Sequence, residues 1–105
     1  MLESKYINCP VHKGMAIFEG KWNSLIIYEL IFQSPMRFGE LRKALPSISN
    51  TMLSSTLKSL EKLGLVERIQ FNEVPPHVEY SLTESGRGLI PIFESLGQWS
   101  EKNIK

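Results

Sequence analysis

The chain has 105 residues, of which 42% are hydrophobic and 22% are charged, and its formal net charge at pH 7 is +1. This length suits one compact domain, and the apolar content excludes a largely disordered chain. The single cysteine excludes an intramolecular disulfide framework, while the small net charge is weak evidence for a nucleic-acid partner.

No apolar stretch is long enough to cross a membrane, since a spanning helix needs about 20 apolar residues. The longest stretch covers residues 25–28 and is interrupted by Glu29. Residues 1–5 lack the basic start and the apolar run of a signal peptide. We therefore expect a soluble, cytoplasmic protein without a membrane partner.

Three helices are predicted in the first part of the chain. The first starts at Pro10, because proline is favoured at the first helical position, and Gly20 ends it. The second runs from near Trp22 to just before Pro35, since the residue preceding a proline avoids helical geometry. A third, shorter helix covers residues 38–45. The second helix is expected to bury an apolar stripe of Trp22, Leu25, Ile26, Leu30 and Ile31.

The segment 48–65 carries the clearest signals for a helix. Ser49 is a good N-cap, because its hydroxyl can accept a hydrogen bond from a free N–H of the first turn. Gly64 supplies the left-handed residue that ends a helix, and Leu65 can fold back on Leu60. The predicted helix covers residues 50–63 and turns Leu53, Leu57 and Leu60 inward.

Two strands follow. Residues 65–71 are rich in β-formers, and residues 77–82 alternate apolar and polar side chains. Between them, residues 72–76 form a turn stiffened by two prolines, so the pair reads as a β-hairpin with a rigid tip. Residues 36–37 are a candidate third strand of the same sheet.

A last helix is predicted after Thr83, its expected cap. Its apolar face is strong, but Pro91 and Gly97 lie inside it. Both residues are costly within a helix, so we expect a bend or an irregular start there.

The element order predicts a mostly helical α+β fold, a winged helix-turn-helix with a two- to three-stranded β-wing. In that arrangement the second helix of the pair enters the major groove of DNA. Its outward residues, together with its cap, are the first candidate DNA contacts: Ser49, Asn50, Thr51, Ser54, Ser55 and Lys58.

Any amphipathic surface helix would also have a polar outer face. This one is unusual in its serines and threonines, which are poor helix formers, and that favours a contact surface. The residues concerned are Ser49, Thr51, Ser54, Ser55, Thr56 and Ser59.

The hairpin is the second candidate DNA-binding element. Arg68, Asn72 and His77 flank its tip and could reach phosphates or the minor groove. Arg37, before the third helix, is a further phosphate contact or else a solvated charge. The alternative for the tip is a plain stiffened turn.

The charge of the predicted DNA-binding part is nearly balanced, with six basic and five acidic residues between residues 34 and 80. A monomer should therefore bind DNA weakly, and a dimer would be needed.

An ordered set of motifs resembles the HxlR family of bacterial and archaeal regulators. The set comprises CP at 9–10, GKW at 20–22, RFGEL at 37–41, LPSIS at 45–49, LEKLGLVER at 60–68 and VPPHVEYSLT at 74–83.

This resemblance implies one HxlR-type domain over residues 1–105, acting as a homodimeric repressor or activator on a palindromic operator in double-stranded DNA. It assigns dimer contacts mainly to 6–22 and 84–103, and the DNA-binding core to 23–83. The apolar face of the last helix fits, because one small domain cannot cover it. The expected interface residues are Val11, Met15, Phe18, Leu89, Ile92, Phe93, Leu96 and Trp99.

Two departures from the family concern the DNA face. The family usually has a basic residue where Asn50 or Thr51 stands, and an arginine where His77 stands in the wing. Both changes remove positive charge, so they bear on affinity and target sequence more than on fold.

Cys9 matches the cysteine through which some members of the family sense quinones, aldehydes or oxidants. A thiol at a helix N-terminus, with His12 and Lys13 in the first turn, lies in a field that favours thiolate. A small electrophile or oxidant is therefore a candidate effector. The alternative is a small apolar residue packed under the dimer interface.

Nothing in the sequence supports catalysis, a metal site or a cofactor. The chain has no aspartate, His12 and His77 lie on different elements, and no glycine-rich phosphate loop is present. The competing function is a winged helix used for protein contacts without DNA. The serine-rich face argues against it, and the low net charge argues for it.

Overall fold

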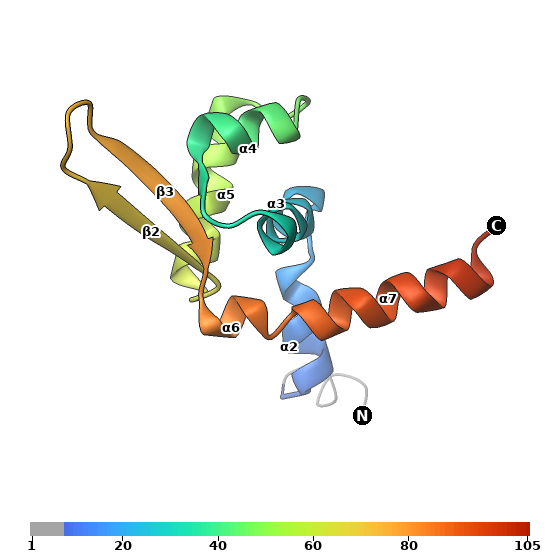
Figure 1. Ribbon diagram of the computed structural model, residues 1–105. Helices are drawn as coiled ribbons and strands as arrows, with labels where there is room; N and C mark the ends of the chain where they lie inside the picture. Colours follow the sequence, from blue (N-terminus) through green and yellow to red (C-terminus); the bar gives the residue numbers. More distant parts are fainter. Residues whose placement is uncertain (1–7) are drawn as a thin grey trace.

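The computed structural model describes residues 8–105 as a group of packed helices with a small sheet at one side (Figure 1). Residues 1–5, for which the sequence predicts no signal peptide, lie outside the described residues. The same holds for residues 6–7 of the expected dimer segment. The elements in chain order are α2 Pro10–Ile17, α3 Lys21–Phe32, β1 Met36–Arg37, α4 Phe38–Ala44, α5 Asn50–Lys62, β2 Val66–Phe71, β3 His77–Leu82, α6 Glu84–Arg87 and α7 Ile90–Asn103.

The sheet has three antiparallel strands in the order β1-β3-β2. Val66 pairs with Leu82 and Phe71 with His77, which leaves residues 72–76 as the tip of the hairpin. Met36 pairs with Tyr80, so the expected third strand is confirmed. The hairpin extends beyond the helices as a wing (Figure 1), and the predicted winged-helix architecture is confirmed.

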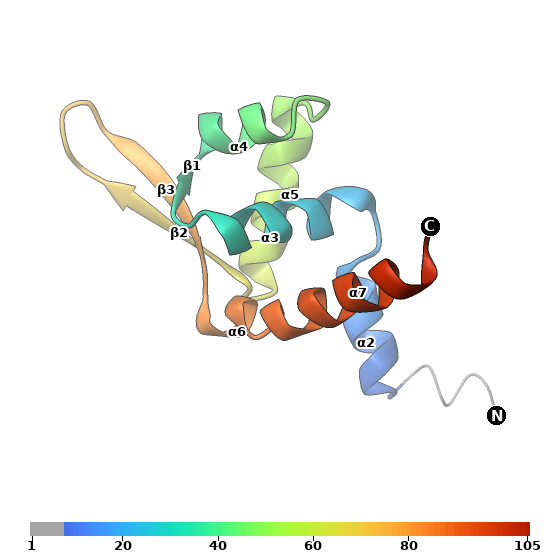
Figure 2. The same ribbon diagram turned by 45° about the vertical axis from the view of Figure 1, so that its right-hand side comes forward.

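The core lies between α3, α4, α5 and the base of the sheet. In both ribbon views α3 lies between α4 on one side and α6–α7 on the other (Figure 2). Because α3 packs against both α5 and β3, it buries Ile26, Ile27 and Leu30, while Leu25 is 38% exposed. The prediction that Leu25 is buried was therefore wrong.

Helix α5 begins at Asn50, as the sequence predicted, and ends at Lys62, one residue before the predicted end. The Ser49 hydroxyl accepts a hydrogen bond from the Met52 N–H at 3.0 Å. At the other end, the N–H of Leu65 donates to the Leu60 carbonyl at 3.0 Å and Gly64 has φ 77°. This is the hydrogen-bond pattern of a Schellman turn.

One residue of the expected polar face of α5 lies inside the protein. Thr56 is 7% exposed and stands among the buried leucines of this helix. It was predicted to be exposed, and it is buried because α5 packs on both α3 and β2, which widens the covered side of the helix.

The C-terminal helix is divided in two. Thr83 caps α6 by accepting from the Gly86 N–H at 3.0 Å, and α6 ends at Arg87. Helix α7 then begins at Ile90 with Pro91 in its first turn, where proline is tolerated. The irregular start expected at Pro91 is confirmed, whereas Gly97 lies within α7 without interrupting it.

Candidate nucleic-acid interface

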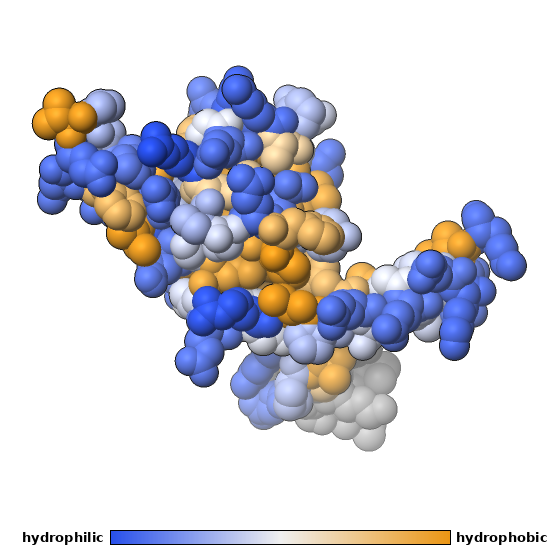
Figure 3. All heavy atoms as spheres, in the orientation of Figure 1, coloured by the Kyte–Doolittle hydropathy of each residue, from blue (hydrophilic) through white to orange (hydrophobic). Residues whose placement is uncertain are grey.

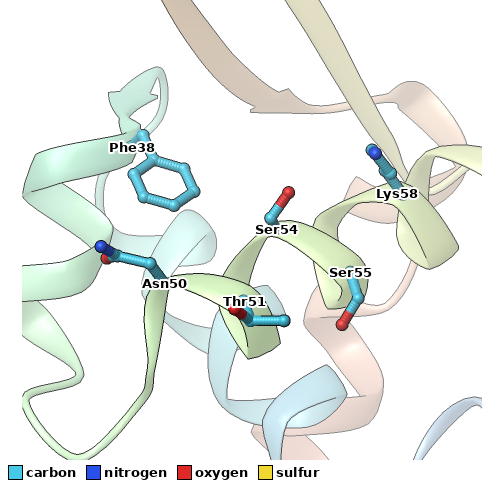
Figure 4. Close-up of a pocket in the computed structure, with 6 residues that line it drawn as sticks. All are labelled: Phe38, Asn50, Thr51, Ser54, Ser55 and Lys58. Atoms are coloured by element: carbon cyan, nitrogen blue, oxygen red, sulfur yellow. The ribbon is translucent and has the colours of Figure 1, made fainter.

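An open hollow of about 500 Å³ lies along the exposed side of α5. We call it the α5 hollow. Most of its wall consists of residues predicted to contact DNA, and Phe38 projects from α4 toward the start of α5 (Figure 4). The lining residues are Phe38, Asn50, Thr51, Ser54, Ser55 and Lys58.

Helix α5 presents these polar groups because its other side is anchored in the core. Leu53, Leu57 and Leu60 are at most 1% exposed, so the helix cannot rotate without exposing leucines. The opposite side then carries short polar side chains, which allow the backbone to approach a base-pair edge closely.

Most polar groups of the α5 hollow have no partner within the described chain. The Ser55 hydroxyl donates to the Met52 carbonyl at 3.2 Å. No hydrogen bond is found for the side chains of Asn50, Thr51 or Ser54 within residues 8–105. Amide and hydroxyl groups of this kind can bond to base edges or phosphates.

Phe38 is the residue of this site that the sequence did not indicate. It is half-buried, packs against the core and forms a wall of the α5 hollow. The only signal was its position directly after Arg37, at the first turn of α4.

The sheet register separates the basic residues of the wing. Arg68 pairs with Tyr80, so it lies on the sheet face that bears the core residues. Arg37 pairs with Glu79, which lies on the opposite face. Both arginines are exposed, and Asn72 is exposed at the start of the tip. The three candidates therefore do not form one patch with each other.

His77 is held by its neighbours. Its Nε2 lies 2.9 Å from Oε2 of Glu79, and its side chain is 15% exposed. Its ring also stacks on Phe71 at a centroid distance of 4.7 Å. His77 thus lies on the face away from Arg68, and its ring is engaged within the wing.

The expected dimer residues divide into two groups. Phe18, Leu89 and Phe93 are half-buried, and the rings of Phe18 and Phe93 meet edge to face at 5.8 Å. The remaining five are each more than half exposed: Val11, Met15, Ile92, Leu96 and Trp99. These belong to α2 and α7, which lie against each other in both ribbon views (Figures 1 and 2).

Cys9 occupies the N-cap position of α2 and is partly buried. Its carbonyl accepts from the Lys13 N–H at 3.0 Å, and its thiol makes no capping hydrogen bond.

Across residues 8–105 no group of three or more His, Cys, Asp or Glu side chains could hold a metal ion. No helix in that same range is long and apolar enough to span a bilayer.

Comparison with known proteins identifies relatives over nearly the whole chain. The family described as HxlR-like helix-turn-helix matches residues 17–105. The uncharacterized HTH-type transcriptional regulator YdeP of Bacillus subtilis is 44% identical over 94 residues, which cover 90% of this chain and 73% of YdeP.

Solved structures show the same fold. The reduced form of the transcriptional regulator YodB from B. subtilis matches with a TM-score of 0.83 at 36% identity, covering 92% of this chain and 95% of that one. YodB also matches in a quinone-bound form, with a TM-score of 0.77. The oxidized form of the redox regulator HypR has a TM-score of 0.80 at 42% identity and covers 92% of this chain and 99% of its own.

Proposed function

Because this chain belongs to the HxlR-like helix-turn-helix family of transcriptional regulators, we propose that it binds a palindromic operator as a homodimer, with α5 in the major groove. The observation that carries this proposal is the α5 hollow. Most of its polar side chains have no hydrogen-bond partner among residues 8–105, and they are presented by a helix whose other side is fixed in the core.

The roles of the individual residues follow from chemistry. Asn50, Thr51 and Ser54 are suited to base edges, while Lys58 is suited to a phosphate. The N-cap Ser49 lies at the phosphate-facing start of α5, where free N–H groups favour an anion. Ser55 would contact the groove through its remaining donor or acceptor capacity.

The wing contributes in a secondary way. Arg68 and Asn72 would reach the backbone beside the groove, and Arg37 would reach a phosphate near α4. We assign His77 a positioning role instead, since its ring is committed to Glu79 and Phe71.

Dimerisation supplies the affinity that one protomer lacks. The net charge of +1 means that few phosphates are neutralised per chain. Two copies joined through α2 and α7 would double the contacts and place two α5 helices about one turn of DNA apart. That dimer would cover five exposed side chains, those of Val11, Met15, Ile92, Leu96 and Trp99. The half-buried Phe18, Leu89 and Phe93 would pack beneath them.

Binding is tested by mobility shift with DNA from upstream of the protein's own gene, across a salt series. The proposal expects salt-sensitive binding that is lost in Ser54→Glu, because a carboxylate in the α5 hollow repels phosphates. Ser59→Glu is the matched control, since Ser59 is an exposed serine of α5 outside that hollow. No binding by the folded dimer at low salt, to this or to genomic fragments, would instead support the protein-contact function.

We also propose that Cys9 controls DNA binding through its thiol. The redox regulator HypR and the quinone-bound form of YodB are similar to this chain, and Cys9 is its single cysteine. A thiolate would add to a ring carbon of a quinone, and the oxygen of the resulting adduct would then take up a proton. An oxidant such as diamide would instead accept two electrons and two protons from two thiols, so that the disulfide joins two chains.

The thiol proposal is tested by treating the protein with diamide or a quinone before the mobility shift. Treatment should change DNA affinity of the wild type and leave Cys9→Ser unaffected. A Cys9→Ser protein that responds like the wild type would rule out control through this residue.

A further inference from the structure

A second hollow lies between α3, the end of β3 and α6, away from the residues assigned to DNA. Its volume is about 310 Å³, and we call it the α3–α6 hollow. Figure 3 shows an apolar area of the surface between α3 and the start of α7, bordered by strongly hydrophilic residues at α6. Its wall is made by Leu30, Ile31, Ser34, Ser81, Leu82, Arg87 and Ile90.

The polar residues of this hollow have hydrogen-bond donors that are not used within the described chain. Arg87 has no ion-pair partner among the described residues, and only one of its five N–H groups is used, to the Leu82 carbonyl at 2.9 Å. The Ser34 Oγ accepts from the Leu82 N–H at 3.3 Å, so its own O–H remains available to donate. No hydrogen bond is found for the Ser81 hydroxyl within the described chain.

A smaller hollow of about 240 Å³ continues from this one, because Ile31 and Ile90 belong to the walls of both. Its lining is aromatic, and Tyr28 stacks on Phe93 at a centroid distance of 5.7 Å. Glu94 is the charged residue of that wall, and it disfavours an anionic group at this end.

We propose that these two hollows together bind a small organic carboxylate with an aromatic or alkyl body. The carboxylate lies against Arg87, Ser34 and Ser81, because a guanidinium with spare N–H groups pairs well with a planar carboxylate. The apolar body lies along Ile31 and Ile90 toward the aromatic end. Mostly apolar walls with a few convergent donors are typical of a small-molecule site.

The proposed site lies between the wing and α7. Ser81 and Leu82 end the strand that carries the wing, while Ile90 begins α7. A ligand that contacts both would couple the wing to α7. That effector role rests on the proposed function, whereas binding itself does not.

The binding test uses the full chain in solution, without DNA. Benzoate is titrated at pH 7 and followed by amide chemical shifts, with benzyl alcohol and inorganic phosphate as separate probes. Benzoate should give saturable shifts confined to residues 31–34, 81–82 and 87–93. The other two should bind at least about tenfold more weakly, because one lacks the charge and the other lacks the apolar body.

The matched variants are Arg87→Gln and Arg42→Gln. Glutamine at 87 can still donate to the Leu82 carbonyl but carries no charge, so benzoate affinity should fall at least about tenfold. Arg42 is an exposed arginine of α4 outside both hollows, and its variant should bind as the wild type does. If Arg87→Gln does not fold, Ser81→Ala serves in its place, with an expected loss of about threefold or more.

Three outcomes would overturn the proposal. These are no saturable shift with benzoate up to about 10 mM, equal affinity for benzyl alcohol, or full affinity in the folded Arg87→Gln variant. Since no DNA is present, a failure of DNA binding in the mobility shift would leave this result untouched, and the converse also holds.

Discussion

Replacing Gly86 with alanine should destabilise the fold, because α6 packs with its backbone on the turn that ends α5. Gly86 is buried, and a Cβ there would overlap the Leu65 carbonyl oxygen and lie 3.0 Å from Cδ2 of Leu82. Leu65 is fixed on the end of α5, since its N–H donates to the Leu60 carbonyl at 3.0 Å, so α6 would have to move instead. The Thr83 hydroxyl, which donates to the Gly64 carbonyl at 2.6 Å, would move with it.

Overpacking against atoms that cannot yield costs about 1–3 kcal/mol, and disturbing the Thr83 cap adds about 1 kcal/mol. We therefore expect Gly86→Ala to lower the free energy of unfolding by about 2–4 kcal/mol. For a chain of this size, that corresponds to a decrease in Tm of at least about 10 °C.

Thermal unfolding followed by circular dichroism measures this directly, at one protein concentration because association would shift Tm. Gly39→Ala in α4 is the control, since a Cβ there meets no atom within 4 Å. Alanine is the better helix former by about 0.5–1 kcal/mol, so the control should keep or slightly raise Tm. A Gly86→Ala variant as stable as Gly39→Ala would refute the close packing of α6 on this turn.

Three further predictions concern single side chains. Lys58→Gln should weaken binding to all DNA sequences alike and reduce the slope of log affinity against log salt by about 1 per recognition helix, measured by mobility shift; an unchanged slope would remove Lys58 from the phosphate contacts. Trp99→Glu should weaken the dimer by about 30-fold or more in sedimentation equilibrium, whereas Val74→Glu, at a wing residue that is 99% exposed, should not. Ser49→Ala should lower stability by about 1 kcal/mol in urea unfolding, because the Met52 N–H loses its acceptor, while Ser47→Ala should have no comparable effect.

Helix α5 shows how much of this site could be predicted from local signals. Its cap, its leucines and its terminal glycine all lie within a single short segment, and each acts on the backbone of that segment alone. The polar face opposite the leucines followed directly from the helical period. Phe38 was missed because it joins the α5 hollow from another helix.

The wing was predicted as a hairpin, but the orientation of its side chains was not. Which face a strand residue occupies depends on the pairing register, and a shift of one residue exchanges the faces. The observed register places Arg68 on one face and His77 with Glu79 on the other. His77 therefore meets Glu79 and Phe71 within the wing, a set of contacts that the alternation of one strand alone does not reveal.

The sequence by itself determined the order of the winged-helix elements, the start and the terminal turn of α5 and its polar face, because these depend on capping, turn chemistry and periodicity within short segments. Only the tertiary structure decided the burial of Thr56, the close approach of Gly86 to Leu65, and the meeting of Ser34, Ser81 and Arg87 around one hollow. Those three residues come from segments far apart in the chain. Packing of α3, β3 and α6 brings them together, and no pattern within a short segment of sequence encodes contacts between such distant segments.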